Sequence, residues 1–133
     1  MANVEQELAA LENGLSSLSS LQEQIDAATW LIKDPLIAKV RHINLHLIRL
    51  CGKLSDMCHK WEHDVAENKT SPDTTEHLDP ETMQRIIADF IIHATQLNNV
   101  LGDDLFKIYK QQVGRNLERY APDSNLNLAL RNK

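Results

Sequence analysis

Four histidines in the middle of the chain form two pairs whose spacing suits metal binding. His42 and His46 are four residues apart, and so are His59 and His63. Residues four apart lie on one face of an α-helix, so each pair could chelate a transition-metal ion through its two imidazole rings. Metal binding on a helix is therefore the first chemistry that the sequence suggests.

The second pair belongs to a longer motif. His59-Lys60-Trp61-Glu62-His63 resembles the HxxEH zinc-binding pattern of the inverzincin metalloproteases. The resemblance implies that His59 and His63 are zinc ligands and that Glu62 is the general base. It covers five residues, and the family's third ligand, a Glu well downstream on another helix, has no clear counterpart here. We keep His59, Glu62 and His63 as candidate metal residues, but predict no catalytic residue, no bound metal and no other cofactor.

The two cysteines offer little chemistry of their own. Cys58 precedes His59, but neighbouring residues on a helix point about 100° apart, so the thiol and the imidazole do not face each other. Cys51 and Cys58 are seven residues apart, which is about 10.5 Å of helical rise and beyond the reach of a disulfide. We predict two reduced cysteines that are buried as small hydrophobic residues.

Helices must position all of these residues, because the apolar residues follow a helical period and Gly and Pro number only 4 each. The first apolar stripe runs from Val4 to Ile32. Poor helix formers interrupt it around Asn13-Gly14 and the serines at 16–20, and Ser20 with Glu23 matches a capping box. One bent helix or two helices would fit this segment, and we favour one bent helix.

The second helix is predicted to start at Asp34-Pro35, because Asp can cap free amides and Pro suits the first helical position. The main apolar stripe of this helix, its seam, has apolar positions spaced alternately three and four residues apart. A second apolar row runs beside the seam, with one residue in every seven. In this register the histidine pairs lie on the outer face with the lysines. The seam consists of Val40, Asn44, Leu47, Cys51, Leu54, Cys58, Trp61 and Val65, and the second row of Leu36, Ile43, Leu50 and Met57.

Residues 66–79 are polar and contain Pro72, which predicts a solvated connector with some disorder. Asp79-Pro80 repeats the helix start signal, and an apolar stripe follows from Met83 to Tyr120. His93 leans inward on it, as a hydrogen-bonded residue at the core edge. Gly102-Asp103 would either lie within one long helix or break it in two.

The expected architecture is all-α: an antiparallel bundle of three long helices, the last whole or broken, with coiled-coil-like heptad seams. We place one domain at residues 1–121, with the connector at 66–79. Pro122 ends the last helix, so residues 122–133 are expected to form a flexible tail or a partner-binding segment.

Composition limits the classes of protein. With 14 Lys+Arg against 19 Asp+Glu the net charge is −5, which argues against a general phosphate-binding surface and makes nucleic acid an unlikely partner. The start of the chain has no signal-peptide pattern, and no window matches the roughly 18 apolar residues of a membrane span. We expect an intracellular protein, cytoplasmic or nuclear, without membrane contact.

Several large apolar residues fall outside the predicted stripes. Leu45 and Ile48 do so in the second helix, and Ile91 and Ile92 in the last one. Together they exceed what a three-helix core of this size buries, so they predict a partner-binding surface. The alternative is that residues 104–120 fold back as a fourth segment and cover them.

The sequence therefore favours a non-catalytic α-helical interaction subunit or adaptor, which assembles with partner helices or with itself in a multi-subunit complex. Two alternatives stay open: a small metal-binding helical protein that uses His59, Glu62 and His63, and a weak nucleic-acid-binding regulator. Zinc retained after dialysis would favour the first, and salt-sensitive gel shifts would favour the second.

Overall fold

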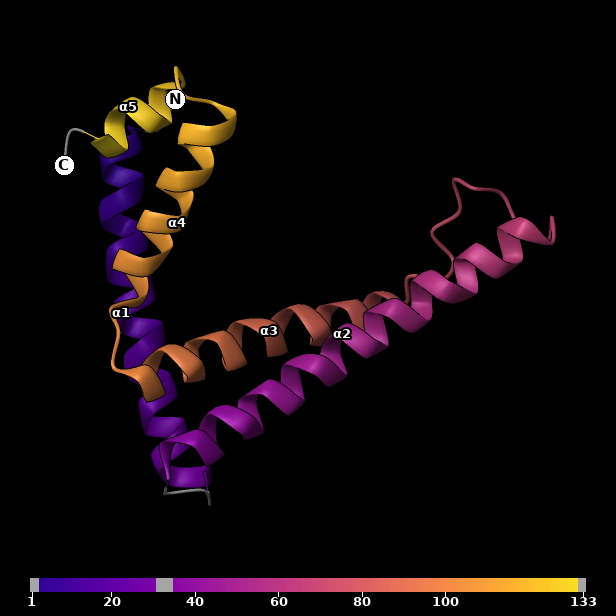
Figure 1. Cartoon of the computed structure of the whole chain (residues 1–133), viewed down its shortest axis with the longest axis horizontal. Helices are drawn as coiled ribbons and strands as arrows, with labels where there is room; N and C mark the ends of the chain where they lie inside the picture. The colour runs from indigo at the N-terminus through magenta and orange to yellow at the C-terminus, as the bar shows by residue number, and fades with distance from the viewer. Residues whose placement is uncertain (1–2, 31–34, 132–133) are drawn as a thin grey trace. The chain divides into compact units, whose positions relative to one another are not determined.

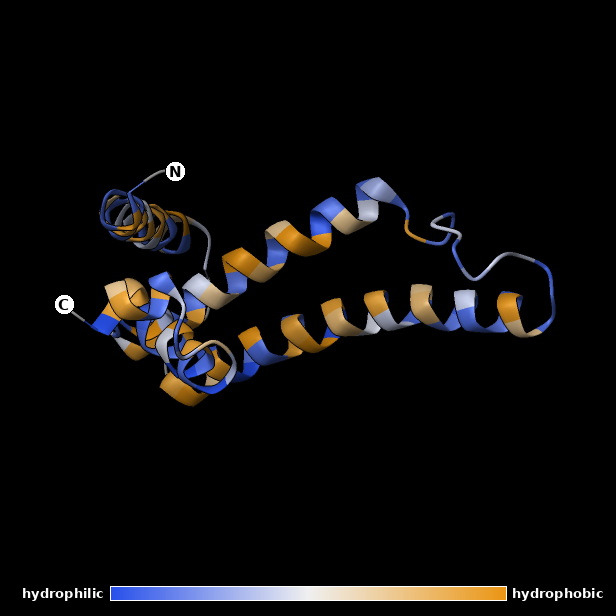
Figure 2. Ribbon diagram, turned by 90° about the horizontal axis from the view of Figure 1, so that it is seen from above, coloured by the Kyte–Doolittle hydropathy of each residue, from blue (hydrophilic) through white to orange (hydrophobic). Residues whose placement is uncertain are grey.

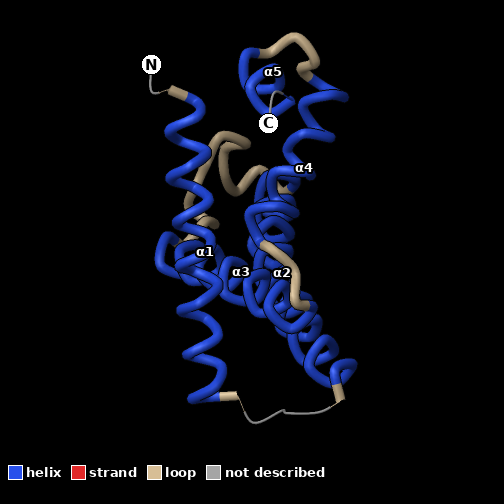
Figure 3. Tube along the Cα trace, turned by 90° about the vertical axis from the view of Figure 1, so that its left-hand side faces the viewer, coloured by secondary structure: helices blue, strands red, loops and turns tan. Residues whose placement is uncertain are grey.

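The computed structural model describes residues 3–30 and 35–131, and the regular structure in those ranges is helical, with no strand (Figure 3). Its helices are α1 (Val4–Thr29), α2 (Leu36–Ala66), α3 (Pro80–Leu101), α4 (Leu105–Tyr120) and α5 (Asn125–Arg131). The all-α class is thus confirmed. The helices sort into two compact units, one with α1, α4, α5 and the end of α3, the other with α2 and most of α3. The single bundle with coiled-coil seams stays a prediction.

The first helix is continuous through its serines, as favoured from the sequence. Asn3 caps it by accepting a hydrogen bond from the amide of Glu5 at 3.0 Å. Along α1, Leu8, Leu11 and Leu15 are half-buried, whereas Leu21 and Ile25 are exposed. Only the N-terminal half of the predicted stripe is therefore covered.

The start signals of α2 and α3 act at the expected places. Helix α2 begins directly after Pro35, and the cap expected from Asp34 lies outside the described residues. At the start of α3, Asp79 Oδ2 accepts a hydrogen bond from the amide of Thr82 at 2.8 Å. These bonds to Thr82 lower the pKa of Asp79, because they stabilise its ionised form.

The last predicted helix is broken at Gly102. This residue has φ +73°, a left-handed conformation that glycine adopts without steric cost and that commonly ends a helix. Helix α4 then begins under the cap of Asp104, whose Oδ1 accepts from the amide of Lys107 at 2.8 Å. Of the two alternatives that the sequence left open, the structure shows the broken helix.

In the first unit α1 packs beside α4, and α5 lies against both (Figure 1). Asn99, near the end of α3, links that segment to α1, because its Nδ2 donates a hydrogen bond to the carbonyl oxygen of Ser19 at 2.9 Å. The segment that we expected to be a tail contains α5, in which Leu130 is buried. Asn127 is buried too, and its Nδ2 donates to the carbonyl of Pro122 at 2.8 Å.

The second unit is an antiparallel hairpin of α2 and α3 (Figure 1). Its core consists of Leu50, Met57 and Ile86, with Leu54, Met83 and Phe90 packed around them. The row Ile43, Leu50 and Met57, predicted as the second row, is the most buried one. The predicted burial of Asn44, Cys51 and Cys58 is wrong, because all three are exposed. Within this unit α2 has one neighbouring helix, so only the row that faces α3 is deeply covered.

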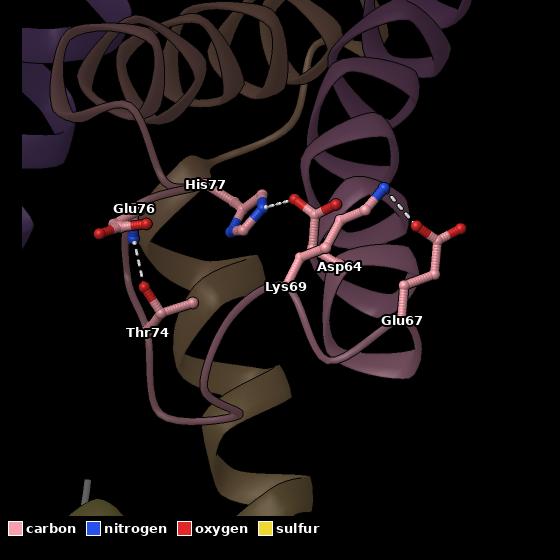
Figure 4. Close-up of polar contacts among 6 residues, drawn as sticks. All are labelled: Asp64, Glu67, Lys69, Thr74, Glu76 and His77. Carbon is pink, nitrogen blue, oxygen red and sulfur yellow. Dashed lines mark hydrogen bonds and ion pairs between the residues drawn. The ribbon is translucent and has the colours of Figure 1, made fainter.

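The connector between α2 and α3 is anchored rather than free in solvent. His77 Nε2 lies 2.6 Å from Asp64 Oδ2 at the end of α2, and the side chain of His77 is only 14% exposed. Thr74 accepts a hydrogen bond from the amide of Glu76 at 3.3 Å, which shapes the turn that carries His77 (Figure 4). The hydrogen bond from His77 lowers the pKa of Asp64.

Candidate functional site

The hairpin of α2 and α3 has two faces of different character, one on each side of the buried rows by which the helices contact each other. A step of four residues turns about 40° around a helix. From Ile43 in α2 one such step reaches Leu47, which is half-buried, and a second reaches Cys51, which is exposed. In α3 the same steps lead from Ile86 to Phe90 and then to Ala94. Because the helices face each other and run antiparallel, both series reach the same face of the hairpin.

Between Arg41 and Glu62, which stand at its two ends, this face is apolar and carries no charge. We call it the apolar face and define it by the exposed residues of its outer rows, which are Ile37, Asn44, Ile48, Cys51, Ser55 and Cys58 in α2 and Gln84, Ile87, Ile91 and Ala94 in α3. Figure 2 shows the hydrophobic colour recurring turn after turn along both helices. Depletion of charge around large apolar side chains is typical of the centre of a protein–protein interface.

The isoleucines of the apolar face are largely uncovered. Ile48 is 58% exposed, Ile87 is 56% exposed and Ile91 is 49% exposed. A single exposed isoleucine is ordinary on a protein surface, but a group of them on adjoining helices marks a surface that another apolar element can cover.

The four residues predicted to bind a partner are all exposed, but they do not share one face. By the helical period, Ile48 and Ile91 lie at the two borders of the apolar face, whereas Leu45 points away from α3. Ile92 belongs to the opposite face. Ile87 was not among the predicted residues, because it falls within the apolar stripe from Met83 to Tyr120, and the sequence alone does not show which side of that stripe stays open.

The opposite face of the hairpin is polar. It forms a hollow of about 450 Å³ between the two helices, with Lys53, Lys60 and Arg85 among its lining residues. Aspartates alternate with these cations, and Asp56 pairs with Lys60 at 3.2 Å. The mixture of signs makes this face a solvated surface rather than a continuous anion-binding ridge.

One of the histidines expected on the outer face is instead at the helix interface. His46 is half-buried and stacks on His93 of α3, with ring centroids 4.7 Å apart, while His42 meets the edge of His46 at 4.6 Å. His93 Nδ1 also bonds Gln96 Oε1 at 2.8 Å, as expected for a residue at the core edge. Burial, followed by the neighbouring His93, lowers the pKa of His46.

The motif residues His59 and His63 meet each other but gather no further ligand. Their rings are in an edge-to-face contact with centroids 4.5 Å apart, and both side chains are exposed with Glu62. Across residues 3–30 and 35–131, no three His, Cys, Asp or Glu side chains group in a way that could hold a metal ion. A structural or catalytic zinc site has at least three protein ligands, so this pair alone does not form one.

The unit of α1, α4 and α5 contains two hollows, one lined by acidic residues with no cation among the described residues around it, and the other by charges of both signs. One, of about 450 Å³, lies between serines of α1 and the acidic residues around Asp104. The other, of about 470 Å³, has Lys107, Lys110 and Arg131 opposite Glu12 and Glu118. Arg131 pairs with Glu118, so part of this charge is already neutralised within the unit.

Comparisons of the chain with protein-family models, with curated proteins and with solved structures find no match. In the described ranges, none of the helices combines the length and the apolar character needed to cross a bilayer.

Proposed function

We propose that this protein is a non-catalytic α-helical interaction subunit, which assembles with partner helices through the apolar face of the α2–α3 hairpin. The observation that supports this most is the exposure of Ile48, Ile87 and Ile91 on one face that carries no charge between Arg41 and Glu62. A partner laid along this face would extend the two-helix layer to a bundle, and the coiled-coil seams expected from the sequence belong to that assembly.

The energy available on this face is substantial for a small chain. Complete burial of an isoleucine side chain contributes about 1.5–3 kcal/mol, so covering the exposed half of each contributes about 1 kcal/mol. Ile48, Ile87 and Ile91 together then contribute about 3 kcal/mol, before the half-buried residues beneath them are counted. An assembly needs further contacts to offset the entropy lost on association, and the extended rows on both helices supply them.

The alternatives from the sequence have weaker support. The metal-binding alternative depends on His59, Glu62 and His63, which bring together two imidazoles, with no third ligand among the residues that the structure describes. The nucleic-acid alternative depends on the polar face, where Asp56 and Asp89 lie among the lysines. No observation favours either over the apolar face.

The test compares two double variants of the tagged full-length chain in extracts of its source cells. Ile48→Asp with Ile91→Asp places charges at both borders of the apolar face. Leu45→Asp with Ile92→Asp makes the same chemical change at exposed positions outside it and serves as the control. We expect the wild type and the control to elute in a complex much larger than 15.1 kDa, and the first variant to elute alone.

Circular dichroism of the purified variants checks that both keep their helices. A wild-type chain that elutes as a single copy in the extract would refute the proposal. Equal loss of the complex in both double variants would refute the assignment of the interaction to this face.

A further inference from the structure

We infer that the element covering the apolar face is the same face of a second copy of this chain, so that two hairpins form a four-helix bundle of two layers with two-fold symmetry. The inference rests on the proposed function and names its partner. Its basis is the charge pattern of α2, which is complementary to itself when two copies run antiparallel.

The charges stand at opposite ends of the face. Arg41 continues the row of Ile48 and Ser55 towards the N-terminus of α2, and Glu62 continues it towards the C-terminus. Both side chains are exposed, and the row between them holds no charge. In an antiparallel pairing of two α2 helices, Arg41 of one copy meets Glu62 of the other, and the reverse pair forms at the other end. The midpoint of this pairing lies between Cys51 and Gly52.

In helix α3, Ile87 and Ile91 form an apolar pair close to the level of this midpoint along the hairpin. The stack of His46 on His93 sets the register of the hairpin. Cys51 is five residues after His46, and Ala88 is five residues before His93, so these two lie at one level. Ile87 and Ile91 stand on either side of that level within about one helical turn. A two-fold axis there brings Ile87 of one copy towards Ile91 of the other.

A single two-fold axis thus pairs α2 with α2 of the second copy and α3 with α3 of the second copy. A partner of another kind would need an uncharged apolar centre with an acidic end opposite Arg41 and a basic end opposite Glu62. The second copy carries that pattern already, in the required order. Cys51 is a small residue at the centre of the face on α2, which permits the two layers to approach closely there.

The test measures the mass of the purified full-length chain by light scattering after size exclusion, over a series of concentrations. We expect twice 15.1 kDa for the wild type. Arg41→Glu and Glu62→Arg should each raise the dimer dissociation constant roughly tenfold, because each creates two like-charge contacts. The double variant with both changes should restore the wild-type constant. Lys53→Glu, an equal charge reversal on the polar face, is the control and should leave the mass unchanged.

Cross-linking at Cys51 tests the position of the two-fold axis directly. In a Cys58→Ser background, a short bismaleimide should link Cys51 to Cys51 of the second copy, and Arg41→Glu should reduce the yield. A monomer at every concentration would overturn the inference, as would a dimer that ignores the charge reversals. A pure chain that is monomeric, yet forms a larger complex in source-cell extract through Ile48 and Ile91, would overturn self-association and leave the proposed function intact.

Discussion

His46 of α2 stacks on His93 of α3, with ring centroids 4.7 Å apart and an interplanar angle of 23°. The contact joins the two helices of the hairpin beside its apolar core. Burial lowers the pKa of His46, and the electrostatic effects of His93, His42 and Arg49 lower it further, whereas Asp89 of α3 raises it. The contact between α2 and α3 therefore includes an imidazole whose pKa is lowered in the folded protein.

The first prediction concerns pH. The pKa of His46 is lowered from its ordinary value of 6.5 in the folded state, so the unfolded chain binds the proton more readily. This contribution to the free energy of unfolding is complete above pH 6.5 and is lost as pH falls through the lower folded pKa. Denaturant titrations on both sides of pH 6.5 should show this loss, and His46→Gln should reduce it. An unchanged pH dependence in that variant would contradict the assignment.

The second prediction concerns the hairpin core. Leu50 is 4% exposed at the centre of the contact with α3, so Leu50→Ala should lower the free energy of unfolding by about 2–4 kcal/mol. Leu45→Ala removes the same atoms from an exposed position and should cost less than about 1 kcal/mol. Chemical denaturation of both variants measures the difference. Equal costs would show that the buried row of α2 has been misplaced.

The third prediction concerns the connector. His77 holds the segment between α2 and α3 against Asp64, so Asp64→Asn removes the charge on the accepting side. We expect faster proteolytic cleavage and faster amide exchange within residues 70–78, because the turn opens more often. Glu76→Gln changes a neighbouring exposed carboxylate and should leave both rates unaltered. The pKa of Asp64 is lowered, so its anchoring is retained above pH 3.8 and weakens as pH falls below it.

The fourth prediction compares two glycines. Gly102 has φ +73°, so Gly102→Ala should destabilise the protein by about 1 kcal/mol through backbone strain. Gly114 lies inside α4 with open space around its Cβ position, so Gly114→Ala should stabilise it by about 0.5–1 kcal/mol. Thermal unfolding of the two variants should shift in opposite directions. A shift of the same sign in both would rule out strain at Gly102 as the cause.

The fifth prediction concerns the histidine motif. Replacing His59 and His63 together by Ala removes two exposed rings that contact each other and leaves the buried rows untouched. The helix content, the melting temperature and the assembly state should stay as in the wild type. Metal analysis of the purified wild type should find less than one zinc per chain after dialysis. One retained zinc per chain, lost together with assembly in the variant, would restore the metal-binding alternative.

The candidate site was predictable in part. Ile48 and Ile91 could be recognised as surplus apolar residues from the sequence, because they depart from stripes that repeat every seven residues. Ile87 could not, since it falls inside a stripe that is wider than one neighbouring helix can cover. Leu45 and Ile92 share their apolar character but lie elsewhere, and only the direction of α3 relative to α2 separates the two groups.

The sequence by itself determined the helical class and most of the helix boundaries. Asp79 before Pro80 acts on a backbone amide three residues away, so local chemistry suffices there. The sequence left open whether the last helix breaks at Gly102, and the structure shows the break, followed by the cap of Asp104. Only the tertiary structure decided which apolar row of α2 is buried. The row of Ile43, Leu50 and Met57 is buried, whereas Asn44, Cys51 and Cys58 of the predicted seam are exposed, and the position of α3 decides between these rows. The same packing moved His46 from the outer face into the interface, because burial depends on a neighbour that lies almost fifty residues away in the chain.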